Sequence, residues 1–393
     1  MANKVANVDD VTDAINGVAV LGHAQHRVPG FGGVPAKLLR SHLHRVPAVA
    51  AEVADSVVRD SALRSGDFAA VGVSAVGSGA ITAMAVNPFD GRVFVADYAG
   101  DAVKVLDGRT LRTAAVIDEV PEPYALSIAR GRVYVSALDC GNDVLAVLDG
   151  QSIQDSHALT DSVADLVADR EGRSVYVART SDTGVDVVVV DTASGMQRSV
   201  ELATRSGEVA TTVRLSGDGR FLVLATTDQL GGRLVVISTA DLSVIDALTV
   251  AEPVRSLAVS HDGATLWVAT DDETVGGLVD VLDMRSHRVV RTVAVDAPVR
   301  QLMLSAAGDR VYAVTADAVC VVCTDSHTVA DIITTDFVPS CVAESGDGSL
   351  LYVAGFDGRV ALYTVAPATP PALARMNTPE ALAGPAVREL ERV

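Results

Sequence analysis

Residues 257–271 read LAVSHDGATLWVATD, which is two short apolar segments joined by a turn that contains Gly263. The apolar segments are built from Val, Leu and Trp, residue types that are enriched in β-strands. Ser, Asp and Gly in the intervening SHDG favour a tight turn. Two such segments separated by a short glycine-containing turn predict a β-hairpin.

The same strand–turn–strand pattern occurs seven times along the chain. It recurs as AVNPFDGRVFVAD at residues 85–97 and as DGSLLYVAG at residues 347–355. Successive turn glycines are 40 to 47 residues apart, a period that with several strands per unit is typical of propeller blades. The turn glycines are Gly91, Gly131, Gly172, Gly219, Gly263, Gly308 and Gly348.

Each repeat contains two further strands after the hairpin. A third strand, often ending in Asp, reads VKVLD at 103–107 and VVVVD at 187–191. A fourth follows a short polar turn, as in TAAVI at 113–117. Four short strands joined by Gly, Asp and Ser turns predict one antiparallel blade, so the fold class is all-β, a seven-bladed β-propeller.

The seventh repeat lacks its fourth strand. After VALYT at 360–364 the chain becomes proline-rich, and PATPP at 367–371 cannot form a sheet ladder. FAAVGVSAV at 68–76, before the first repeat, reads as a strand without a blade of its own. We therefore predict that this N-terminal strand pairs with the last strand and closes the ring, which removes exposed sheet edges.

The flanking segments differ from the repeats and suggest three parts. Residues 1–67 form an N-terminal extension, residues 68–365 the propeller, and residues 366–393 a C-terminal tail rich in Pro and Ala. From Ala36 to Val57 the apolar residues are spaced by three or four, as on one helix face, although Pro47 interrupts the pattern. We expect a small, partly helical extension that packs on the propeller or docks a partner.

The repeat resembles the Tyr-Val-Thr-Asn (YVTN) family of short propeller repeats. AVNPFDGRVFVAD, LAVSHDGATLWVATD and DGSLLYVAG carry the resemblance, which extends over roughly residues 68–365. It implies a seven-bladed propeller, an architecture that serves many unrelated roles. Lactonases that open sugar lactones use a related repeat, but the His-Pro motif of that group is absent. Asn87-Pro88 and His261-Asp262 occupy the corresponding positions.

The composition disfavours some kinds of binding partner and some cellular locations. Lys and Arg number 31 against 50 Asp and Glu, a formal charge of −19 that disfavours nucleic acid and anionic lipid. No apolar run reaches the roughly 18 residues of a membrane helix. The first 25 residues lack the basic start and apolar core of a secretory signal, so we expect a cytoplasmic, monomeric, acidic protein.

The cysteines and histidines do not indicate a metal or a cofactor. Cys320 and Cys323 lie three residues apart on one predicted strand and so point to opposite faces, which predicts ordinary buried thiols. Four histidines within 22 residues of the extension lack the i, i+4 spacing of a helical metal site. They are His23, His26, His42 and His44.

The mouth of the propeller channel is the expected place for a site, because the inner strands of all blades converge there. Counting back eight residues from each turn glycine gives Ala83, Ala164, Thr211, Arg255, Arg300 and Ser340, and alignment on its proline gives Ala125 in the shortened second blade. Arg255 and Arg300 thus come from adjacent blades. Two guanidiniums at one level repel unless a bound anion or a carboxylate lies between them. Local salt bridges to Asp or Glu are the alternative.

We predict a non-enzymatic propeller that acts as a protein-interaction or ligand-binding scaffold, without cofactor. The predicted ligand-binding residues are Arg255, Arg300, Thr211 and Ser340, with no catalytic or metal-binding residue. The expected partner is a protein or a small anionic ligand. The alternative is a lactonase-like hydrolase that acts on a small sugar lactone or a related anionic metabolite at the channel mouth.

Overall fold

The structure of the chain is a computed structural model. It describes Ser41–His42 and residues 67–139, 141–160, 162–202, 204–272, 275–295 and 297–366. All of them belong to one compact unit, Leu39–Val393. The helices expected between residues 36 and 57 lie outside the described ranges except at Ser41–His42, and so does nearly all of the C-terminal tail. Within the described ranges, no helix is long and apolar enough to cross a membrane.

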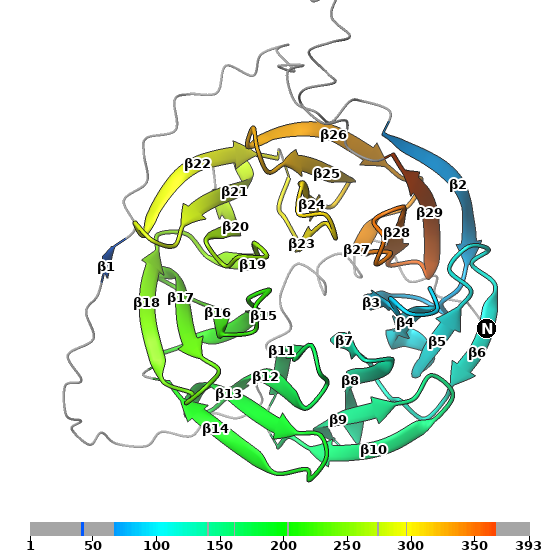
Figure 1. Cartoon of the computed structure of the whole chain (residues 1–393), viewed down its shortest axis with the longest axis horizontal. Coiled ribbons are helices and arrows are strands. Elements are labelled where there is room, and N and C mark those ends of the chain that lie inside the picture. Colours follow the sequence, from blue (N-terminus) through cyan, green and yellow to red (C-terminus); the bar gives the residue numbers. More distant parts are fainter. Residues whose placement is uncertain are drawn as a thin grey trace, which may run out of the picture. The chain divides into compact units, whose positions relative to one another are not determined.

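The described chain forms seven four-stranded antiparallel sheets around a common axis, one of them extended by a short fifth strand (Figure 1). Blade 1 consists of β3 (Ile81–Val86), β4 (Val93–Asp97), β5 (Ala102–Leu106) and β6 (Thr113–Ile117). Blade 2 consists of β7 (Leu126–Ala129), β8 (Arg132–Asp139), β9 (Asn142–Leu148) and β10 (Ile153–Ala158). Blade 3 consists of β11 (Ser162–Ala168), β12 (Ser174–Ser181), β13 (Gly184–Asp191) and β14 (Gln197–Glu201).

The remaining blades repeat this arrangement. Blade 4 consists of β15 (Val209–Leu215), β16 (Phe221–Asp228), β17 (Gly231–Ser238) and β18 (Val244–Val250), and β1 (Ser41–His42) pairs in parallel with β18. Blade 5 consists of β19 (Val254–Val259), β20 (Thr265–Asp272), β21 (Gly276–Asp283) and β22 (Arg288–Ala294). Blade 6 consists of β23 (Gln301–Leu304), β24 (Arg310–Val314), β25 (Ala318–Cys323) and β26 (Thr328–Thr334). A 3-10 turn, η1 (Tyr98–Gly100), follows β4.

Blade 7 is completed by the N-terminal strand, as the sequence predicts. It consists of β27 (Pro339–Glu344), β28 (Leu350–Gly355), β29 (Arg359–Val365) and, outermost, β2 (Phe68–Ala75). β2 runs antiparallel to β29, so that Phe68 lies opposite Val365, and Figure 1 shows the two ends of the ring side by side. The prediction of a seven-bladed ring closed by an N-terminal strand is confirmed.

The recurring turn owes its shape to a serine and an aspartate. In blade 5 the Ser260 hydroxyl donates to the Asp262 carboxylate at 2.7 Å and accepts a hydrogen bond from the Thr265 amide at 2.9 Å. Gly263 has a φ of +69°, a conformation that glycine adopts without steric cost. The hydrogen bond from Ser260 is the main reason that the pKa of Asp262 lies below its usual range.

The hydrophobic core lies between blades rather than within one central mass. One cluster joins Tyr352 of blade 7 to Val95 of blade 1, so the last blade packs on the first. On β25, Cys320 belongs to a cluster shared with blade 5, whereas Cys323 belongs to one shared with blade 7. The two buried thiols therefore point to opposite faces of their strand, as predicted.

Candidate functional site

Three of the four predicted ligand-binding residues occupy the same irregular position in different blades. A register shift near the start of the inner strand leaves Thr211 in β15, Arg255 in β19 and Ser340 in β27 outside the regular pairing. Such a bulge bends the strand and re-aims one side chain. Arg300 immediately precedes β23, and its amide donates to the carbonyl oxygen of Val314 at 2.8 Å.

Two other blades place a different residue at this position from the one that the sequence predicts, which is Ala83 by glycine counting and Ala125 by alignment on its proline. The bulge of blade 1 falls on Thr82 rather than Ala83, because the turn before Gly91 is one residue longer. In blade 2 the amide of Tyr124 makes the bond that Arg300 makes in blade 6, donating to Ser136 at 3.1 Å. Alignment on the paired strands, instead of on the turn glycine or the proline, finds both residues.

We call the seven equivalent positions the mouth ring. They mark the end of the propeller at which the inner strands begin: five of them lie on inner strands, and the other two lie just before one. Figure 1 shows these inner strands around the axis. The mouth ring consists of Thr82, Tyr124, Ala164, Thr211, Arg255, Arg300 and Ser340.

Thr211 and Ser340 are engaged locally. The Thr211 hydroxyl donates to the carbonyl oxygen of Ala225 within its own blade at 3.1 Å. Ser340 is buried, and its hydroxyl lies 3.9 Å from the Sγ atom of Cys341. Both residues belong to the mouth ring. The Thr211 hydroxyl is already hydrogen-bonded and Ser340 is buried, so they are weaker candidates for ligand binding than the arginines.

Arg255 forms the local ion pair that the sequence left open as an alternative. Its Nε atom donates to Oδ2 of Asp271 on the neighbouring strand of the same blade, at 2.6 Å. The Arg255 side chain keeps 41% of its surface exposed, and the other carboxylate oxygen of Asp271 is buried without a hydrogen-bond partner. Arg255 is therefore neutralised at rest while part of its guanidinium faces solvent.

Arg300 is different because its guanidinium has no carboxylate partner among the residues that the structure describes. It lies over the ring of Phe356 in blade 7, with 4.8 Å between the guanidinium carbon and the ring centroid. Its Nη1 atom is buried and has no hydrogen-bond partner. Burial lowers the pKa of Arg300, and the charge of Asp317 only partly opposes that shift.

Other basic residues at this end of the described blades are paired with acids. Lys104 lies 2.8 Å from Asp97, Arg233 lies 2.9 Å from Glu208, and these carboxylates are almost fully buried. Each pair ties two neighbouring segments together. The contrast shows that Arg300 departs from the local rule, in which a buried charge receives an opposite charge.

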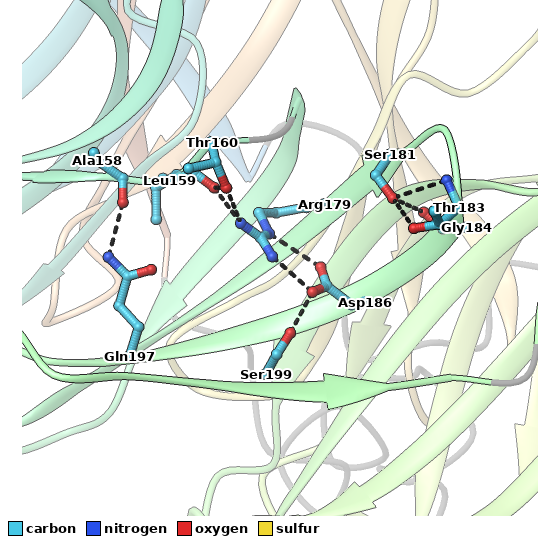
Figure 2. A network of polar contacts seen from close by, with 10 residues as sticks. All are labelled: Ala158, Leu159, Thr160, Arg179, Ser181, Thr183, Gly184, Asp186, Gln197 and Ser199. Atoms are coloured by element: carbon cyan, nitrogen blue, oxygen red, sulfur yellow. Dashed lines mark hydrogen bonds and ion pairs between the residues drawn. The ribbon is translucent and has the colours of Figure 1, made fainter.

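Figure 2 shows the fullest of these networks, in blade 3. Arg179 on β12 makes a two-pronged contact with Asp186 on β13, with N–O distances of 3.0 and 2.7 Å. The same guanidinium donates to the carbonyl oxygen of Leu159, and Ser199 donates to Asp186. The network joins the end of blade 2 to three strands of blade 3, β12, β13 and β14, so we assign it a structural role.

The mouth ring holds no obvious metal site. Across the described ranges, no three His, Cys, Asp or Glu side chains converge closely enough to hold a metal ion. His42 is the only one of the four N-terminal histidines placed on a described strand, and the others lie outside the described residues.

Comparison with known proteins fits the observed architecture. No protein-family profile matches the chain. The chain is 31% identical over 315 residues to "Seven-bladed beta-propeller protein Rv1057" of Mycobacterium tuberculosis, which spans 70% of this chain and 80% of that protein. Hydrazine synthase of Kuenenia stuttgartiensis superposes with a TM-score of 0.66 over 75% of this chain and 97% of that chain, at 16% identity, a likeness of fold alone. The chain belongs to the seven-bladed β-propeller family that includes Rv1057.

Proposed function

We propose that the protein is a non-enzymatic binding propeller whose mouth ring receives a small anionic ligand, a carboxylate or a phosphate. The observation that carries this proposal is Arg300, a half-buried guanidinium with a buried, unpartnered Nη1 atom. A buried donor without a partner costs about 1–3 kcal/mol, and an anion would supply the missing acceptor.

The surroundings of Arg300 suit recognition of a planar anionic group. The ring of Phe356 supports one face of the guanidinium and fixes its orientation, so its N–H groups point in fixed directions for charge-assisted hydrogen bonds. Arg255 stands at the equivalent position of the adjacent blade and provides a second positive charge. Its contact with Asp271 keeps that charge balanced when the ligand is absent.

A binding role accounts for the carboxylates around the mouth ring better than hydrolysis of a lactone does. A hydrolase needs an acid or a base that is free to exchange a proton with the substrate. Asp271 accepts from Arg255, and Asp228 lies 3.4 Å from Arg205. Both carboxylates therefore form ion pairs with arginines, which disfavours a role for them as a free general acid or base.

The test is a thermal-shift and calorimetric panel of small carboxylates and phosphates with the wild type, Arg300→Ala and the double variant Arg255→Ala/Arg300→Ala. Arg285→Ala is the control, because that arginine is exposed on a turn at the other end of blade 5. We expect at least one anion to stabilise the wild type and the control, as preferential binding to the folded state requires. We expect this stabilisation to be lost in both mouth variants.

Two results would overturn the proposal. One is a panel in which no anion stabilises the wild type, or in which Arg300→Ala responds like the wild type. The other is turnover of a sugar lactone by the wild type, which would establish the lactonase-like alternative instead.

A further inference from the structure

A second group of arginines lies at the opposite end of the propeller, between blades 2 and 3. The hairpin turns there border a pocket of about 380 Å³. Three arginines and a single glutamate line it, an excess of positive charge in a chain whose net charge is −19. They are Arg130, Arg132, Arg173 and Glu171.

Four blades carry an arginine directly after the turn glycine, and in two of them the acid of the same turn neutralises it. In blade 1, Arg92 follows Asp90 by two residues, and the two side chains lie 3.6 Å apart. In blade 4, Arg220 follows Asp218 by two residues at 2.5 Å. The Asp-Gly-Arg turn is therefore a self-contained ion pair on an exposed loop.

Blades 2 and 3 break this pairing. In blade 2 the position of the acid is taken by Arg130, two residues before Arg132. Arg130 forms an ion pair with Glu171, which is the acid of the blade 3 turn. Consequently neither Arg132 nor Arg173 has a carboxylate within ion-pair distance in the described part of the chain, and both side chains are exposed.

Two side-chain hydrogen bonds fix the backbone of the blade 3 turn that borders the pocket. The hydroxyls of Tyr134 and Thr192 both donate to the carbonyl oxygen of Gly172, at 2.9 and 2.7 Å. Gly172 has a φ of +65°, and a Cβ atom there would lie 2.9 Å from the Tyr134 hydroxyl. The turn that carries Arg173 is thus tied to the strand that carries Arg132 and Tyr134.

We propose that this pocket binds a phosphate monoester through Arg132 and Arg173. A phosphate monoester carries close to two negative charges at neutral pH and offers three acceptor oxygens, which matches two unpaired guanidiniums. A monocarboxylate would leave one of them without a charge partner. The phosphate could belong to a free metabolite or to a phosphorylated side chain of a partner protein, because the recognising chemistry is the same.

The experiment measures binding of O-phosphoserine and of a phosphoserine peptide by calorimetry to the full chain. The variant Arg132→Ala/Arg173→Ala is compared with Arg92→Ala/Arg220→Ala, which removes two arginines from equivalent exposed turns and changes the net charge equally. We expect the first variant to bind phosphoserine at least about tenfold more weakly, since two charge-assisted contacts are lost. We expect the second to change affinity less than about twofold, as a purely long-range effect of charge would.

Arg130→Asp provides an independent arm, because it restores the acid that the repeat has elsewhere. It gives Arg132 a partner and leaves Glu171 for Arg173, so binding is expected to fall at least as far as in the double alanine variant, with folding unchanged by circular dichroism. Equal losses in the two double variants, or wild-type binding by Arg130→Asp, would refute the site. The loss caused by Arg132→Ala/Arg173→Ala is expected to be the same in the Arg300→Ala background, because Arg300 lies at the other end of the ring.

The peptide arm identifies the source of the phosphate. Binding of the peptide about tenfold or more tightly than free phosphoserine would assign the pocket to a phosphorylated partner. Equal affinities would assign it to a small phosphorylated metabolite. Absence of binding by either compound to the wild type would overturn the proposal.

Discussion

Tyr352 of blade 7 donates its hydroxyl hydrogen to the carbonyl oxygen of Gly108 in blade 1, across 2.9 Å and 244 positions of sequence. The tyrosine is 1% exposed, and its burial raises the pKa of the hydroxyl to about 12. This contact joins the last blade to the first at the end of the ring that carries the hairpin turns. It complements the pairing of β2 with β29 as a device that closes the circle.

Tyr352→Phe should lower the free energy of unfolding by about 1–2 kcal/mol, because it leaves the Gly108 carbonyl without its buried donor. Chemical denaturation measures this loss. Tyr363→Phe in the same blade is the matched control, since its hydroxyl lies 3.5 Å from the Thr334 carbonyl oxygen, too far for a strong bond. Equal effects of the two substitutions would show that the Tyr352 contact does not stabilise the ring.

Gly108→Ala should destabilise the fold by about 1–3 kcal/mol, the usual cost of forcing extra atoms into a packed site. A Cβ atom at this position would lie 2.1 Å from the carbonyl oxygen of Gly91 and 2.7 Å from the Tyr352 hydroxyl. Gly72→Ala in β2 is the control, because nothing lies within 4 Å of its added Cβ atom. Thermal unfolding should separate the two variants clearly, and similar midpoints would contradict the packing described here.

Asp347→Asn should lower the free energy of unfolding, and this loss should be largest at neutral pH. The hydroxyl of Ser345 and neighbouring donors hold the pKa of Asp347 at about 2, below its ordinary value of 3.8. The ionised carboxylate therefore stabilises the fold above about pH 4, and this contribution disappears as the pH falls toward about 2. Because the group is exposed, we expect a difference below about 1 kcal/mol.

Denaturation of wild type and Asp347→Asn at a series of pH values checks this prediction. The difference between the two proteins should shrink steadily as the pH is lowered from about 4. Asp118→Asn, which removes an exposed acid just after β6, controls for the loss of one negative charge. A stability difference that grows as the pH falls would contradict this prediction, and with it the stabilising role of the ionised Asp347 carboxylate.

The thiols of Cys320, Cys323 and Cys341 should remain unlabelled by a thiol reagent in the native protein at mildly alkaline pH. All three are buried, and burial raises the pKa of Cys341 to about 12, so its thiolate is scarce. Mass spectrometry of labelled peptides should find these three sites modified only after denaturant is added. Rapid native labelling of any of them would contradict the packing between blades.

The sequence was sufficient for the ring but not for the details of its site. Gly263 and its counterparts are predictable because a tight turn constrains residue type locally, and the closing strand is predictable because the seventh repeat lacks one. Thr82 was misplaced because turn length varies between blades while strand pairing does not. The stacking of Arg300 on Phe356 is a contact between two blades, so no sequence pattern within one repeat predicts it.

The pairing of Arg130 with Glu171 has the same origin. Each residue looks like an ordinary turn residue in its own blade, and only the contact between blades shows that two arginines are left without acids. The one signal in the sequence is the change from Asp-Gly-Arg to Arg-Gly-Arg at residues 130–132. Comparison of the repeats position by position would have revealed it.

Every site described here depends on the closed circle, and native-state hydrogen exchange at β2 and β29 tests that circle most directly. We predict slow exchange for the β2 amides bonded to β29 and for the β29 amides that face β2, on the timescale of global unfolding. Those β29 amides have their partners only in β2. Exchange of both sets within seconds, while β28 stays protected, would show that the ring is open.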